Sequence, residues 1–304
     1  MTEAEGANQP VAPNSGMIAS FAKVLFDDSA GWVAVRAFSE KGDASQPART
    51  PFVAADAELP TKLVAEAEAA AKKGLALYVV AGTVSGPGKA KAGDVIAIET
   101  VLVDLDHGDV SAKREHLVKH LGPPSLEVAS GGVTAEGQER LHLYWKLNEP
   151  ATGADIAKVC DLRGVIAAKA GGDPSFRSAH QPIRVAGSVY RKGGVERLVI
   201  VRTERAVEHD LTEFADRVEA MPSLFSEADG EGSQPVGTKG SVINLFAHAV
   251  REGGADGITR FDALSRVIGY WIRRFRDGHV TREQAWEEIV SYNAACVVPP
   301  WPLV

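Results

Sequence analysis

The segment VLVDLDHGD, residues 101–109, combines the pattern of a buried strand with acidic side chains. Its β-branched and apolar residues predict a strand, in which alternate side chains point to the same face. Asp104 and Asp106 therefore share one face with Leu102. Two carboxylates at this spacing repel each other and resist desolvation. Such a strand either ends in water or at a helix cap, or it binds a hard divalent cation, which takes oxygen ligands.

Alternating strand and helix patterns predict a mixed α/β (α+β) domain over residues 17–222. Expected strands cover residues 31–39, 75–84, 94–106, 125–132, 140–147, 183–190 and 197–203, and expected helices cover residues 60–74, 111–121 and 154–171. In the strand RLHLYWKL, the alternation places Leu141, Leu143 and Trp145 on one face. The other face carries His142, Tyr144 and Lys146.

Three further parts are expected outside this domain. Residues 1–16 are polar and predict a disordered leader, and residues 223–240 are rich in Gly, Ser and acids, which is typical of a linker. Residues 241–304 have helical patterns throughout and predict a small all-helical domain. The chain stops at VVPPWPLV without a natural terminator. We therefore expect a chain truncated before further domains.

Composition excludes several classes of protein. No apolar run approaches the roughly 18 to 20 residues that span a bilayer, so no membrane partner is expected. Cys160 and Cys296 lie far apart without metal-ligand spacing, which predicts no zinc site and a reducing, cytoplasmic location. The net charge of −7 argues against a protein that coats nucleic acid. However, residues 177–205 hold seven Lys or Arg against two acids, which indicates either solvated surface or a local binding patch.

Acidic pairs on a strand occur in several classes of metal-dependent enzyme. Phosphatases of the haloacid-dehalogenase type carry Thr or Val two positions after the second acid, where this chain has Gly108. Nucleotidyltransferases of the polymerase-β type place a Gly–Ser pair at a helix start before their acids, whereas Ser85 and Gly86 begin a loop here. Both interpretations are disfavoured, and a metal-dependent glycosyltransferase stays open. Asp109 follows Gly108, and we expect it to face solvent or cap the next helix.

Four downstream segments follow the acidic pair in order: EVASGG, LHLYWKLNEP, AGGDPSF and PIRVAGSVYRK. Together with DLD they resemble the motifs of the archaeo-eukaryotic primase superfamily, in particular the primase-polymerases (PrimPol) of phages, plasmids and integrated elements. The resemblance covers residues 75–205. The helices of residues 241–304 look like the primase C-terminal helical module of such proteins. One departure is VTAEGQER, which separates the Gly–Gly pair from the histidine strand where relatives run directly on.

The resemblance implies an RRM-like antiparallel sheet that carries the acids, followed by a small all-helical domain. It also implies nucleotidyl transfer by a mechanism with two Mg²⁺ or Mn²⁺ ions. The implied catalytic metal ligands are Asp104, Asp106 and Asp173. The groups expected at nucleotide phosphates are His142, Ser130, Gly131, Arg184, Ser188 and Lys192. The groups expected at the template backbone are Arg260, Arg266, Arg273 and Arg274.

These features predict a DNA primase and DNA polymerase that makes and extends primers, for replication of a mobile element such as a phage or plasmid. The expected partners are a single-stranded DNA template, a primer, dNTP or NTP, and a helicase domain or protein. Two alternatives stay open. One is a catalytically idle replication-initiation module that binds nucleic acid, and the other is a metal-dependent phosphatase.

Overall fold

A computed structural model describes residues 11–39, 47–225, 250–251, 260–276 and 280–302. The chain divides into two compact units, residues 1–229 and residues 230–304, which are described separately. In the described part of the chain, no helix is long and apolar enough to cross a membrane.

The first unit is built on an eight-stranded sheet in the order β10-β5-β6-β4-β3-β1-β2, with β7 paired to β3 beside this path. Every pair of neighbouring strands in it is antiparallel. The strands are β1 (Trp32–Ser39), β2 (Phe52–Ala54), β3 (Leu75–Val84), β4 (Val95–Leu105), β5 (Leu126–Val133), β6 (Glu139–Thr152), β7 (Pro182–Arg184) and β10 (Ile200–Glu204). A separate hairpin consists of β8 (Val189–Lys192) and β9 (Val195–Leu198). The expectation of an antiparallel sheet that carries the acidic strand is confirmed.

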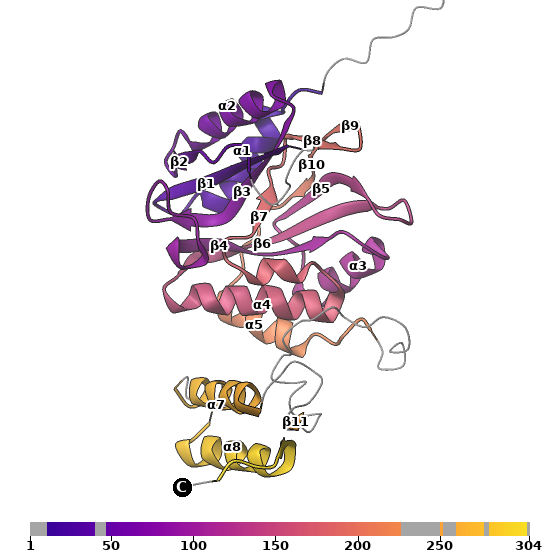
Figure 1. The fold of residues 1–304 in the computed structure, drawn as a ribbon. Helices are drawn as coiled ribbons and strands as arrows, with labels where there is room; N and C mark the ends of the chain where they lie inside the picture. The colour runs from indigo at the N-terminus through magenta and orange to yellow at the C-terminus, as the bar shows by residue number, and fades with distance from the viewer. Residues whose placement is uncertain (1–10, 40–46, 226–249, 252–259, 277–279, 303–304) are drawn as a thin grey trace, which may run out of the picture. The chain divides into compact units, whose positions relative to one another are not determined.

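Helices cover both faces of this sheet (Figure 1). They are α1 (Ser15–Phe26) and α2 (Leu59–Lys72) on one face, and α3 (Val110–Leu121), α4 (Ala154–Ala170) and α5 (Leu211–Ala220) on the other. Each face has its own hydrophobic core. Leu102 and Tyr144 lie in the core under α1 and α2, and Leu143 and Trp145 lie in the core over α3 and α4. Both faces of β6 are therefore buried, including the face that carries His142.

The sheet forks between β3 and β4. These strands pair only at Thr83 with Ala97 and at Val84 with Val95. The middle of β3 pairs instead with β7, from Tyr78 opposite Arg184 to Val80 opposite Pro182. Within the described residues, the C-terminal half of β4, which leads into the acids, therefore has no strand partner on its β3 side.

The sequence predictions differ from the structure at a few places. Helix α1 was not expected, and it begins at Ser15, so the expected leader of residues 1–16 overlaps it. The single strand predicted over residues 183–190 is wrong. The chain turns at Gly187, whose φ of +78° favours glycine, and β7 and β8 lie on either side of this turn. Apart from residues 223–225, the expected linker over residues 223–240 lies outside the described residues.

The described residues of the second unit include helices α7 (Arg260–Arg276) and α8 (Arg282–Cys296). Thr281 and Gln284 form a capping box at the start of α8: each side chain accepts a hydrogen bond from the other's backbone N–H. The structure adds a short parallel pair that the all-helical expectation lacked, β11 (Val250–Arg251) with β12 (Val297–Val298).

Candidate active site

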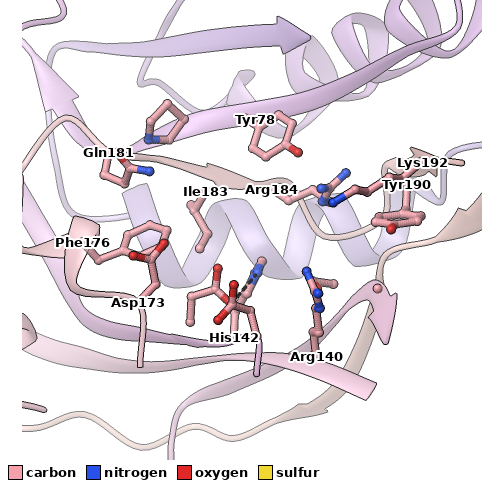
Figure 2. A pocket seen from close by; sticks show the side chains of 15 residues that line it. Tyr78, Arg140, His142, Asp173, Phe176, Gln181, Ile183, Arg184, Tyr190 and Lys192 are labelled. Atoms are coloured by element: carbon pink, nitrogen blue, oxygen red, sulfur yellow. Dashed lines mark ion pairs between the residues drawn. The ribbon is translucent and has the colours of Figure 1, made fainter. Parts of the chain in front are cut away.

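A pocket lies in the fork of the sheet. Its lining includes Asp104, Asp106, His142 and Asp173, and also Arg140, Arg184, Lys192, Tyr78, Tyr190 and Ser130. Figure 2 shows Arg184 and Tyr78 on one side of the pocket, across from His142 and Asp173. The acids therefore face Arg184 across the pocket, while Arg140, which comes from the same strand as His142, lies on the His142 side. These residues come from segments far apart in the sequence.

Asp104 lies on β4 directly opposite His142 on β6. Its side chain is only 19% exposed, and its Oδ1 lies 3.7 Å from Nε2 of His142. The pKa of Asp104 is raised to about 7, first by burial and then by the nearby negative charges of Asp106 and Asp173, against the effect of Arg184 and Arg140. The carboxyl group is therefore poised to lose its proton when a cation enters the pocket.

His142 is buried, with Tyr144 beside it in the same strand. The Tyr144 hydroxyl lies 3.3 Å from Nδ1 of His142, so Nε2 is the ring nitrogen that faces Asp104. Burial lowers the pKa of His142 to about 3, and the positive charge of Arg184 acts in the same direction. The imidazole is therefore neutral at physiological pH, and it can contact a ligand by a hydrogen bond but not by a positive charge.

Asp106 lies just beyond the end of β4, where the chain turns away. Its Oδ1 is 2.6 Å from Nδ1 of His107, and Gly108 has a φ of +61°, which allows the turn. Asp109 then caps α3 by accepting a hydrogen bond from the Ala112 N–H. The expectation that Asp109 faces solvent or caps the next helix is confirmed, since this exposed residue does both.

Asp173 is held beside the acidic strand by its backbone, because its N–H donates to the Asp104 carbonyl at 2.9 Å. Its side chain starts the short helix η2 (Pro174–Arg177). Oδ1 accepts from the Ser175 N–H and Oδ2 from the Ser175 hydroxyl, both at 2.8 Å. Asp173 thus lines the pocket while both of its oxygens are engaged by Ser175.

A buried lysine joins the two acidic segments. Lys113 on α3 is 5% exposed, and its Nζ donates to the carbonyls of His107 and Gly171, each at 2.7 Å. These carbonyls lie one residue after Asp106 and two residues before Asp173. Lys113 therefore fixes the spacing of the two segments that carry these acids.

Replacing Lys113 by Met is expected to lower the free energy of unfolding by about 2–3 kcal/mol, because two partly buried carbonyls lose a charged donor. The melting temperature should fall by roughly 5–10 °C. Lys119→Met is the matched control on the same helix, since Lys119 is exposed. Equal melting temperatures for the two variants would show that the lysine bridge adds nothing to stability.

Two of the basic residues of this pocket also line a second pocket. Arg140, Tyr190 and Lys192 line both pockets, and the second is completed by Gly131, Gly132, Val133, Val195 and Arg197. The positive charges therefore continue from the acidic residues along the β8–β9 hairpin. Such a surface suits phosphate groups.

The structure places the other predicted phosphate ligands at different positions. Arg184, Lys192 and Ser130 line the first pocket, and Gly131 lines the second. Ser188 lies outside both linings, because its buried hydroxyl donates to the Val185 carbonyl at 2.6 Å. Its role is to stabilise the turn between β7 and β8.

Of the arginines expected at the template, Arg260 is described with its side chain. Its Nη1 donates to the Pro299 carbonyl, and its guanidinium lies 5.2 Å from the Trp301 ring centroid. The side chains of Arg266, Arg273 and Arg274 lie outside the described part of the structure.

Sequence reasoning missed Arg140, Tyr78 and Tyr190 as pocket residues. Arg140 comes two positions before His142 in a strand, so the alternation that grouped His142 with Tyr144 could have included it. Tyr78 carries no such signal, because it enters the pocket only through the pairing of β3 with β7.

The acids partly fit a divalent cation. Among the described residues, no group of three or more His, Cys, Asp or Glu side chains is arranged to hold a metal ion. Carboxylate oxygens are nevertheless the ligands that Mg²⁺ and Mn²⁺ prefer. Oδ1 of Asp104 is buried and makes no hydrogen bond within the described part of the chain. This oxygen fits a cation ligand together with Asp106, whereas Asp173 would first have to turn away from Ser175.

Comparisons with solved structures identify the fold. The first unit has the fold of an archaeo-eukaryotic primase domain. It is similar to the domain of this type in the primase-polymerase of cyanophage S-2L, with a TM-score of 0.52 and 17% identity over 68% of this chain and 100% of that one. No family model matches the sequence, and neither does any curated protein.

Two further structures are similar at lower scores. The catalytic domain of the primase RepB′, solved with initiator DNA, gives a TM-score of 0.44 and 14% identity over 67% of this chain and 94% of that one. The polymerase domain of Mycobacterium tuberculosis ligase D, solved with DNA, gives a TM-score of 0.36 and 18% identity over 72% of this chain and 92% of that one.

Proposed function

We propose that this protein is a DNA primase-polymerase that catalyses template-directed nucleotidyl transfer. One observation carries the proposal: a single pocket brings Asp104, Asp106 and His142 opposite Arg184 and Lys192. Carboxylates that can bind a divalent metal ion then lie across one cavity from basic side chains that can bind phosphates. A nucleoside triphosphate with its metal ion requires this arrangement of charges. The primase-type fold supports this function.

The reaction would join a primer 3′-hydroxyl to the α-phosphorus of a nucleotide and release pyrophosphate. Bound Mg²⁺ or Mn²⁺ would supply charge neutralisation at the attacking and leaving oxygens. Asp104 and Asp106 would hold the cation, and Asp173 would join them on turning from Ser175. Arg184, Lys192 and Arg140 would hold the phosphates by charge-assisted hydrogen bonds. His142 would orient a phosphate by a neutral hydrogen bond.

The partners follow from this chemistry. A single-stranded DNA template with its primer would bind along the cationic surface that continues into the second pocket. The second unit would contribute template contacts through the arginines of α7. Replication of a mobile element, together with a helicase, is the biological setting that the sequence resemblance favours.

Two observations favour a second candidate, a nucleic-acid-binding module without turnover. Both oxygens of Asp173 are engaged by Ser175, and among the described residues no three-ligand metal cluster is formed. If this arrangement persists with substrates bound, the protein would bind DNA but would not extend it.

Incorporation of labelled nucleotides on single-stranded and primed DNA, with Mg²⁺, Mn²⁺ or EDTA, tests the proposal. Template-dependent products that vanish in EDTA are the expected result. Tight template binding by the same preparation without any product would support the binding module and overturn the polymerase. Release of phosphate from simple phosphoesters without template would indicate a phosphatase.

A further inference from the structure

Arg184 lies between two aromatic rings inside the candidate pocket (Figure 2). Its guanidinium carbon is 4.6 Å from the ring centroid of Tyr78 and 4.7 Å from that of Tyr190. Tyr78 pairs directly with Arg184 across β3 and β7, and Tyr190 comes from β8. Three separate strands therefore build this arrangement.

Stacking restrains an arginine differently from an ion pair. An ion pair uses the in-plane N–H donors, as in Arg114, whose Nε and Nη2 donate to the Glu127 carboxylate at 2.6 and 2.9 Å. Aromatic stacking covers the two faces of the guanidinium and leaves its edge donors available. Nη1 of Arg184 is buried and has no hydrogen-bond partner in the described part of the chain. Because an unpaired buried donor is costly, its presence in a pocket indicates a ligand that completes it.

The backbone is shaped around the second ring. Gly131 on β5 has a φ of +87°, and a Cβ added there would lie 2.5 Å from Cβ of Tyr190. The other ring is also supported, since Phe38 packs edge-on against Tyr78 with 5.2 Å between centroids. Both tyrosines are therefore held in place by the sheet.

We propose that Tyr78 and Tyr190 are positioning residues that clamp Arg184 so that its edge N–H groups meet a phosphate group of the bound nucleotide. This inference rests on the proposed function. In it, the tyrosine rings orient the guanidinium of Arg184. The rings act through their faces. The Tyr78 hydroxyl also interacts with the Arg184 side chain, so the hydroxyl that the clamp can lose is that of Tyr190.

Two measurements test the clamp: the Kd of a deoxynucleoside triphosphate and of inorganic tripolyphosphate by calorimetry, and KM and kcat for incorporation. Tyr78→Leu and Tyr190→Leu should each raise both Kd values and KM roughly tenfold, with a much smaller change in kcat. Tyr190→Phe should retain affinity within about threefold, because the ring face remains. Tyr78→Phe should lose less affinity than Tyr78→Leu, because it keeps the ring and loses only the interaction of the hydroxyl with Arg184. Phe52→Leu is the matched control: it removes a ring that lies 5.8 Å from Arg36, outside the pocket lining.

A double-mutant cycle separates positioning from folding. In an Arg184→Gln background, the Leu substitutions should have no further effect on Kd, since the cation they aim is gone. Leu variants that bind like wild type would overturn the clamp, and so would Phe variants that lose as much affinity as Leu variants. Additive losses in the Arg184→Gln background would overturn it too, because the tyrosines would then act independently of Arg184.

The same data separate the clamp from the proposed function. Wild type that binds triphosphate through the clamp but incorporates no nucleotide would overturn the polymerase and leave the clamp standing. Wild type that binds neither triphosphate nor tripolyphosphate would overturn both.

Discussion

Replacing Asp104 by Asn is expected to abolish nucleotide incorporation while it stabilises the folded protein above pH 7. The loss of activity follows from the loss of a negatively charged cation ligand at the centre of the pocket. Metal stabilisation of transition-state charge amounts to several kcal/mol, so incorporation should fall about 10³-fold or more. Incorporation assays with Mg²⁺ and Mn²⁺ measure this effect.

The gain in stability follows from the raised pKa of Asp104. Its folded-state value of about 7 lies above the ordinary 3.8. The protonated group thus contributes stability that is complete below about pH 4 and is lost as the pH rises through 7. Asn does not titrate, so at pH 8 it avoids a penalty on the order of a few kcal/mol. In EDTA, the melting temperature of the variant should rise relative to that of wild type as the pH is raised from 4 to 8.

The lowered pKa of His142 reduces the stability of both proteins as the pH falls below about 6.5. Comparing wild type with the variant at each pH therefore removes this contribution. Glu149→Gln is the control, since this acid is exposed and distant from the pocket lining. A melting difference between Asp104→Asn and wild type that is constant with pH would contradict the proposed burial of the charge. Retained incorporation would contradict the role of Asp104.

Replacing Gly172 by Ala is expected to destabilise the fold and misplace Asp173. A Cβ at this position would overlap Cγ2 of Val103 and would lie 3.2 Å from the Asp104 carbonyl. The β-branched valine cannot turn away easily, so the loop must move. The expected cost is about 3 kcal/mol, or roughly 5–10 °C in melting temperature. Incorporation should fall as well, because the displaced loop contains the hydrogen bond from the Asp173 N–H to the Asp104 carbonyl on β4.

Gly93→Ala provides the matched control, because an added Cβ there meets nothing within 4 Å and the residue lacks a positive φ. Combining Gly172→Ala with Val103→Ala should recover part of the lost stability, since the overlapping methyl group is removed. Full additivity of the two substitutions would show that this contact is not the cause.

Local patterns predicted most of the fold. The acidic strand and the α3, α4 and α8 helices follow from alternation, helical spacing and caps, which act within a few residues. The fork between β3 and β4 could not be predicted, because it depends on β7, which lies about a hundred residues further along the chain. Helix α1 was missed although Asn14 caps it and Ile18, Phe21 and Leu25 have helical spacing.

In the candidate site, too, the residues with a local sequence signal were predicted, and those placed by long-range strand pairing were not. Asp104 and His142 lie on adjacent strands and were matched by motif. The aromatic neighbours of Arg184 depend on the fork and had no local signal. The side-chain alternation of β6 suggested a polar face, but Tyr144 packs edge-on against Phe21 with 5.9 Å between centroids. A second core on that face explains why His142 is buried.

The departure VTAEGQER proves to be the tip of a hairpin. Strands β5 and β6 continue past the pocket to a turn in which the Thr134 N–H donates to the Gln138 carbonyl, and Val128 still lies opposite His142. Beyond Ala129 opposite Leu141 the register is irregular, and the next pair is Val133 with Glu139. The extra residues therefore form a bulge and a turn, and the pairing below them is unchanged. For a comparison of distant sequences, the number of residues between two motifs on such strands is a poor measure of the distance between them. Alignments that penalise a gap at this turn would discard a match that the strand register preserves.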